Sequence, residues 1–133
     1  IMAGVICADT LQDGAGNSTA MDNAIYGSAK AWVNYNGVAQ TVRASYNVSS
    51  VVRNGTGDYT VNFATALTNA NYSVAGTNSP QYGTTFTLPV QMFADRATDS
   101  QQTPTTSSFR CFIVNSSGTS FSPVYVCLSI FGA

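Results

Sequence analysis

The sequence predicts a single, small, all-β domain. From Ala29 onward, short stretches in which apolar and polar residues alternate recur every 8 to 15 residues, and turns rich in Asn and Gly separate them. Short strands at such regular spacing are typical of a sandwich or a Greek-key barrel. The chain has 133 residues and is 44% hydrophobic, which is enough for one core. We therefore expect one antiparallel β-sandwich, jelly-roll-like or Greek-key, with at most one or two short helical turns.

The first 28 residues differ from the rest of the chain. They are rich in Gly, Ala, Asn and Asp, and their apolar residues follow neither the period of a strand nor that of a helix. The stretch Asp13-Gly14-Ala15-Gly16-Asn17 has the composition of a turn. We expect residues 1–28 to be an irregular linker and residues 29–133 to be the β-sandwich domain.

Two hairpins are predicted at the start of this domain. Residues 30–35 form a strand that ends at an Asn-Gly turn, and residues 41–48 form the strand that follows it. A second hairpin covers residues 51–63 around the turn at 54–57, with Tyr59, Val61 and Phe63 facing inward. In the first strand we expect Trp32, Val33 and Tyr35 to belong to the core.

The middle of the domain gives weaker patterns. Residues 65–71 tolerate a helix of one or two turns, and residues 72–75 form a strand that is followed by a loop at 76–83. Residues 84–93 form a further strand, which Pro89 places at an edge or a bulge. Residues 94–108 form a long polar loop, and loops of this length in compact domains tend to be functional.

The last two strands, residues 108–114 and 123–131, flank a turn at 115–118 and form a predicted hairpin. Both faces of each strand are apolar, whereas a solvated face would be polar. One face packs on the core, and the other needs a second layer or a neighbouring subunit. The expected subunit-interface residues are Phe112, Val114, Tyr125, Cys127 and Phe131.

Charge is scarce, which excludes several classes of partner. Charged residues make up 8% of the chain and the net charge is −1. The cations are dispersed along the sequence: Lys30, Arg43, Arg53, Arg96 and Arg110. Nucleic acids and anionic membranes need clustered cations, so we expect neither partner. No apolar run approaches the roughly 18 residues of a membrane span.

The residue types also argue against catalysis, metals and cofactors. The chain has no His and no Glu, so it lacks a Ser-His-Asp or Cys-His arrangement, and any carboxylate pair must come from its six Asp residues. We therefore expect no enzyme and no cofactor. Cys7, Cys111 and Cys127 do not have metal-ligand spacing. They could form one disulfide with a free thiol left over, but three buried free thiols are the favoured prediction.

If the chain binds a ligand, the loop aromatic Tyr82 is the best candidate. It lies between Pro80-Gln81 and Gly83-Thr84, where small polar neighbours give it little core to join. Tyr rings stack on sugars and present rigid contact area. The remaining candidate ligand-binding residues supply polar contacts: Asn78, Gln81, Asp95, Arg96 and Asp99.

Three stretches carry a resemblance to a known family. They are Lys30-Ala31-Trp32-Val33, Arg43 to Ser49 and Asn54 to Phe63, within Ala29 to Val74. This run resembles a C-terminal head module of phage tail-fibre and tail-associated virion proteins, common in marine phages. The approach at residues 8–23 also resembles the linker into such heads, and the resemblance covers about half of the chain densely and much of the rest loosely.

The resemblance implies a homotrimeric fibre or spike tip at the virion surface, in which β-rich heads pack about a threefold axis. Its partners would be other copies of itself, other virion fibre proteins and a host surface glycan, bound non-covalently. Two alternatives remain open. One is a structural virion subunit without a receptor, such as a capsid decoration, collar or fibre protein, and the other is a secreted bacterial adhesion module.

Overall fold

The computed structural model describes residues 4, 7–80, 91–92, 94–95 and 100–132. The chain is mostly β-strand with one short helix, α1 (Met21–Gly27). The strands are β1 (Thr10–Gln12), β2 (Ser18–Ala20), β3 (Ala29–Asn36), β4 (Thr41–Tyr46), β5 (Val48–Gly55), β6 (Asp58–Phe63), β7 (Ser73–Asn78), β8 (Gln91–Met92), β9 (Ala94–Asp95), β10 (Ser100–Gln101), β11 (Ser108–Phe112) and β12 (Val126–Phe131). This confirms the predicted all-β class.

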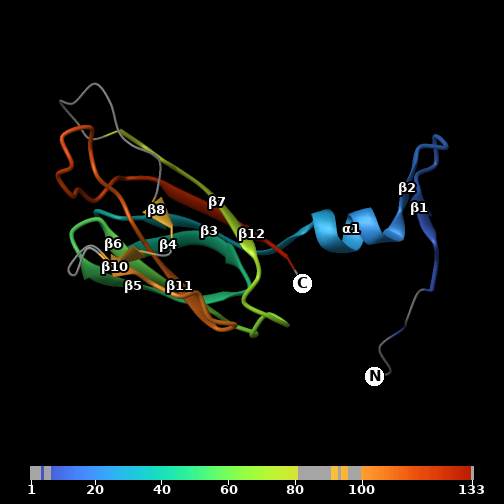
Figure 1. The fold of residues 1–133 in the computed structure, drawn as a ribbon. Coiled ribbons are helices and arrows are strands. Elements are labelled where there is room, and N and C mark those ends of the chain that lie inside the picture. The colour runs from blue at the N-terminus through green and yellow to red at the C-terminus, as the bar shows by residue number, and fades with distance from the viewer. Residues whose placement is uncertain (1–3, 5–6, 81–90, 93, 96–99, 133) are drawn as a thin grey trace.

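Two four-stranded antiparallel sheets make up the body (Figure 1). One has the strand order β4-β3-β12-β7 and the other has the order β5-β6-β11-β8. Two small pairs, β1-β2 and β10-β9, complete the described strands. Asn47 joins β4 of the first sheet to β5 of the second, and its φ of 51° lies in the left-handed region that Asn tolerates.

The two sheets share one hydrophobic core. Because side chains alternate along a strand, every second residue of β3, β6, β11 and β12 faces the same interior. The buried members on these strands are Ala31, Val33, Tyr35, Tyr59, Val61, Phe63, Phe109, Cys111, Val126, Leu128 and Ile130. The rings of Tyr35 and Tyr59 meet edge to face across the sheets, 5.3 Å between centroids. Each large buried side chain contributes roughly 1.5–3 kcal/mol to folding.

The two predicted hairpins of the first half of the domain are confirmed. β3 pairs antiparallel with β4, and β5 pairs antiparallel with β6. Tyr59, Val61 and Phe63 are buried as expected. The expectation for Trp32 is wrong: it is 39% exposed because it lies between two inward-facing neighbours, Ala31 and Val33. A strand can bury only one of its faces against a single core.

The predicted C-terminal hairpin is also wrong. β11 pairs with β6 and β8, whereas β12 pairs with β3 and β7, so the two strands lie in different sheets. Between the two strands the chain makes a short local turn, with a bridge between Val114 and Ser120 and hydrogen bonds from the Asn115 N–H to the Thr119 carbonyl and from the Phe121 N–H to the Ile113 carbonyl. This connection crosses from one sheet to the other. β11 and β12 each turn one apolar face to the core that the two sheets share.

The N-terminal segment is more regular than predicted. β1 and β2 form a hairpin, and the Asp13 side chain holds its turn by accepting hydrogen bonds from the backbone N–H groups of Ala15 and Asn17. The Asn17 side-chain amide, which donates to Asp13 Oδ2 at 2.8 Å, does most to lower the pKa of the Asp13 carboxyl, and the backbone bonds lower it further. The helix α1 follows the hairpin directly and has no buried residue. Residues 65–71, which were expected to tolerate a helix, contain none.

The elements predicted after residue 80 are only partly described. Most of the strand expected at 84–93 lies outside the described residues, and β8 is the described part of it. The loop predicted at 94–108 contains the short pair β9-β10. No helix in the described part of the chain is long and apolar enough to cross a membrane.

All three cysteines are unpaired. Cys111 lies in the core, where burial raises the pKa of its thiol to about 12. Cys127 is half-buried on β12. Cys7 is exposed, contrary to the expectation that all three thiols are buried, because the segment that carries it lies outside the core.

Two buried tyrosines differ in how their hydroxyl groups are satisfied. The Tyr72 hydroxyl shares its one hydrogen between the carbonyl oxygens of Thr105 and Ser108, which lie 3.0 and 3.1 Å from its oxygen. Tyr59 is the only described residue with a buried side-chain polar atom that makes no hydrogen bond. Ser122 is close enough to oppose the rise that burial causes in the Tyr59 pKa, but no bond of ordinary length and angle joins the two hydroxyls.

We expect opposite effects from deleting these two hydroxyls. Tyr59→Phe should leave the free energy of unfolding unchanged or raise it by up to about 1 kcal/mol, since an unsatisfied buried hydroxyl is removed. Tyr72→Phe, the matched control, should lower it by about 1–2 kcal/mol because the Thr105 carbonyl loses the Tyr72 hydroxyl, while the Ser108 carbonyl still accepts from the Thr105 N–H. Urea unfolding of both variants measures the difference. Equal losses would show that the Tyr59 hydroxyl is satisfied.

Candidate functional site

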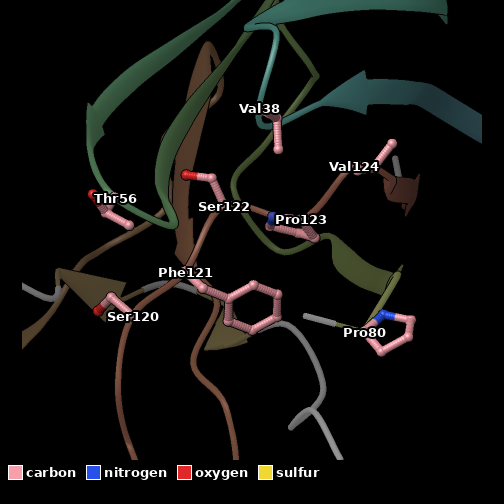
Figure 2. Close-up of a pocket in the computed structure, with 8 residues that line it drawn as sticks. All are labelled: Val38, Thr56, Pro80, Ser120, Phe121, Ser122, Pro123 and Val124. Carbon is pink, nitrogen blue, oxygen red and sulfur yellow. The ribbon is translucent and has the colours of Figure 1, made fainter. Parts of the chain in front are cut away.

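A pocket lies where four chain connections meet at one end of the two sheets. It has a volume of about 450 Å³ and is drawn in Figure 2. Its lining residues come from the β3–β4 turn, the β5–β6 turn, the residues after β7, and the β11–β12 connection: Val38, Thr56, Pro80, Ser120, Phe121, Ser122, Pro123 and Val124. The helix α1 and the hairpin β1-β2 lie at the opposite end of the sheets (Figure 1).

Close backbone contacts hold the β11–β12 connection against the β5–β6 turn. The Ile113 N–H donates to the Gly57 carbonyl at 2.8 Å, and the Gly57 N–H donates to the Ser122 hydroxyl at 3.2 Å. A Cβ at Gly57 would lie 2.5 Å from the Phe121 carbonyl oxygen and 2.6 Å from that of Ile113. Gly57 also has a φ of +72°, so only glycine suits this position.

A second contact ties the same connection to the β3–β4 turn. The Gly37 N–H donates to the Pro123 carbonyl at 2.9 Å. A Cβ at Gly37 would lie 2.5 Å from the Tyr59 hydroxyl oxygen, so this turn rests directly on the core. The pocket is therefore fixed on two sides by turns that the sheets hold in place.

The described residues that line the pocket are uncharged, and together they form an amphipathic surface. Five members are apolar and three carry hydroxyl groups (Thr56, Ser120 and Ser122). The ring of Phe121 is central among them in Figure 2 and is only 5% exposed, so it forms part of the floor. Such a surface suits a neutral ligand with both C–H faces and polar groups.

A cation lies at the rim of the pocket. The Arg43 guanidinium donates through Nη1 to the Val124 carbonyl at 2.8 Å and to Asn34 Oδ1 at 3.3 Å. Its Cζ lies 4.1 Å from the centroid of the Tyr125 ring, a cation–π contact. Val124 lines the pocket, so Arg43 contacts the lining through the Val124 carbonyl, and Tyr125 is the next residue along the chain.

Only one of the ligand residues expected from sequence can be located near the pocket. Gln81, Tyr82, Arg96 and Asp99 lie outside the described residues, and of Asp95 only the backbone is described, in β9. Asn78 ends β7 half-buried, and its side-chain amide donates to the Ser79 carbonyl. Two residues further on, Pro80 lines the pocket.

The expected interface residues are spread over several environments. Val114 is 6% exposed and belongs to the interior of the chain, whereas Tyr125 is 50% exposed. Phe112, Cys127 and Phe131 are half-buried. Cys127 and Phe131 alternate with the buried residues of β12, so they lie on the outer face of the β4-β3-β12-β7 sheet.

The other sheet carries an ion pair with a structural role. Arg110 Nε and Nη2 donate to the two carboxylate oxygens of Asp58, at 2.8 and 2.7 Å. The Asp58 side chain is only 5% exposed, and the two residues come from the neighbouring strands β6 and β11. Among the described residues, no group of three His, Cys, Asp or Glu side chains could hold a metal ion.

Sequence reasoning missed Val38, Arg43 and residues 120–124. The Asn36-Gly37 turn and the Gly-containing turn at 54–57 were recognised as turns, but nothing local indicated that they meet. Their proximity depends on the crossing of residues 113–125 between the sheets.

The pocket should depend on Gly57 far more than on Gly55 of the same turn. We expect Gly57→Ala to lower the free energy of unfolding by at least about 2 kcal/mol, because the new methyl group meets two carbonyl oxygens at a positive φ. Gly55 has no atom within 4 Å of an added Cβ, so Gly55→Ala should change stability by less than about 0.5 kcal/mol. Thermal and urea unfolding measure both. A tolerated Gly57→Ala would contradict the close approach.

Comparisons with known proteins give no relative for the chain: no family model, no curated protein and no solved structure matches it. A proposal for its function must therefore be based on the chemistry of the described residues. Three features carry that chemistry, namely the uncharged pocket, the Arg43–Tyr125 pair at its rim, and the outer face of the β4-β3-β12-β7 sheet.

Proposed function

We propose that the chain is the head domain of a virion fibre or spike and that it binds the host cell surface non-covalently, through a carbohydrate that enters the pocket. The observation that carries this proposal is the pocket at the end of the sheets where the β3–β4 and β5–β6 turns meet, whose described lining is uncharged and amphipathic. The resemblance of Ala29 to Val74 to phage tail-fibre heads supports it. The proposed function is binding alone, without catalysis and without a cofactor.

A carbohydrate fits the lining better than other common ligands do. A sugar ring presents apolar C–H faces together with hydroxyl groups, and the pocket presents apolar side chains together with three hydroxyls. Each hydrogen bond to such a ligand contributes about 0.5–1.5 kcal/mol net. One site would therefore bind weakly, and several heads on one particle would recover strength through avidity.

The position of the pocket is consistent with a tip. The first strand of the body begins, and β12 ends, at the end of the sheets near α1, because Ala29 pairs with Phe131. The pocket lies at the other end, beyond the pair Tyr35–Val126. In a head attached through its N-terminal segment, the pocket would face away from the particle.

We further propose that the two sheets form a β-sandwich, jelly-roll-like or Greek-key, and that heads associate as a homotrimer. The outer face of the β4-β3-β12-β7 sheet supports the assembly. Trp32 and Tyr46 are cross-strand partners on it, 39% and 58% exposed, and Phe131 lies on the same sheet. Aromatic residues are enriched, and Lys and Glu depleted, at protein interfaces.

Filling the pocket should abolish carbohydrate binding. Val38 is 61% exposed at the pocket, and Val38→Arg would place a long side chain across it. We expect the full wild-type chain to bind at least one saccharide class on an array of immobilised glycans. The variant should bind at least about tenfold more weakly, a loss of 1.4 kcal/mol. Biolayer interferometry with the saccharide identified on the array gives the affinities.

The matched control is Val52→Arg on β5, which adds the same side chain at a 47% exposed position of the other sheet. It should bind as the wild type does. If the wild type binds no saccharide, the structural-subunit alternative is favoured. If Val38→Arg binds as well as wild type, the ligand does not enter this pocket.

The proposed trimer should be sensitive to charge on the outer face of the β4-β3-β12-β7 sheet. Burying an unpaired carboxylate costs several kcal/mol, so Trp32→Asp should convert a wild-type trimer to monomer at micromolar concentration. Val52→Asp on the other sheet should leave the trimer intact. Analytical ultracentrifugation reads the mass of each form. A monomeric wild-type chain would overturn the trimer and leave the pocket proposal standing.

A further inference from the structure

Arg43 points outward because of a β-bulge. Asn34 pairs with Ala44 and Tyr35 pairs with Val42, so Arg43 is the extra residue between them. Without the bulge, Arg43 would lie opposite Tyr35, which is 2% exposed and faces the core. Its bond to Asn34 instead puts it on the outer face. Bulges commonly re-aim a side chain in this way next to binding sites.

The guanidinium is held in one place although it is exposed. The Val124 carbonyl and Asn34 Oδ1 both accept from Nη1, and Cζ lies 4.1 Å from the centroid of the Tyr125 ring. These contacts remove rotamer freedom that an exposed Arg would otherwise lose on binding a ligand.

The same contacts leave binding capacity unused. Within the described residues, Arg43 Nε and Nη2 make no hydrogen bond and no carboxylate pairs with the group. Nε and Nη2 form the edge of the fork that accepts both oxygens of a carboxylate. Arg110 provides the comparison inside this chain, since its Nε and Nη2 hold both oxygens of Asp58.

We propose that Arg43 binds the carboxylate of an acidic saccharide whose ring occupies the neighbouring pocket. This deepens the proposed function and rests on saccharide binding there. The described residues of the pocket lining are neutral and suit the ring. Two cations contact this lining: Arg53 donates through Nη2 to the Thr56 hydroxyl, whereas Arg43 keeps Nε and Nη2 for an anionic substituent. The acidic sugar class therefore combines both features, whereas a neutral sugar would leave Arg43 unused.

The test compares glucuronate with glucose, which differ only in a carboxylate that replaces a hydroxymethyl group. NMR titration of the full chain at low salt gives both affinities. We expect wild type to prefer glucuronate about fivefold, as for a well-placed Arg–carboxylate pair at a surface. In Arg43→Gln the preference should vanish while glucose binding is retained.

Lys30→Gln is the matched control, because it removes the same charge near α1, at the opposite end of the sheets. It should keep the preference, and thermal unfolding verifies that both variants are folded. Equal binding of the two sugars by wild type, or a preference that survives Arg43→Gln, would overturn this inference and leave the proposed function intact. Binding of neither sugar would also overturn this inference, whereas the glycan array alone decides the saccharide pocket.

Discussion

The close approach at Gly57 is the constraint on which the rest of the site depends. Residues 113–125 leave β11 in one sheet and enter β12 in the other, so this connection must turn back across the end of the core. It can do so only because Gly57 presents no side chain to the carbonyls of Ile113 and Phe121. That contact brings residues 120–124 beside the β5–β6 turn and so creates the pocket.

The sequence predicted the strands better than their partners. Alternation in β6 was strong enough to identify Tyr59, Val61 and Phe63 as inward-facing, and the Asn-Gly turns fixed two hairpins. The same alternation cannot say which strand lies next to which. β11 and β12 are neighbours in sequence with a turn between them, yet each pairs with strands from earlier in the chain. Trp32 failed for a related reason, since two inward neighbours already occupy the core side of β3.

The pocket was beyond sequence reasoning because its parts are distant along the chain. Val38, Thr56, Pro80 and Phe121 come from four separate connections, and none of them has a local signal for a ligand. Arg43 was equally hidden, because only the pairing of β3 with β4 shows that it is the extra residue of a bulge. A bulge has no reliable pattern in a six-residue strand of mixed polarity.

Scarcity of charge makes the fate of each arginine informative. Arg110 is neutralised by Asp58 between adjacent strands, where it stabilises the β6–β11 pairing. Arg43 is held instead by a carbonyl, an amide oxygen and a ring, none of which neutralises it. The bulge that turns Arg43 outward leaves one residue of β4 unpaired in the strand ladder, which lowers the stability of the sheet. Among the described residues, Arg43 makes no ion pair that would compensate for this loss. Arg43 is thus held in position without being neutralised. A ligand that brings its own anion would explain this arrangement.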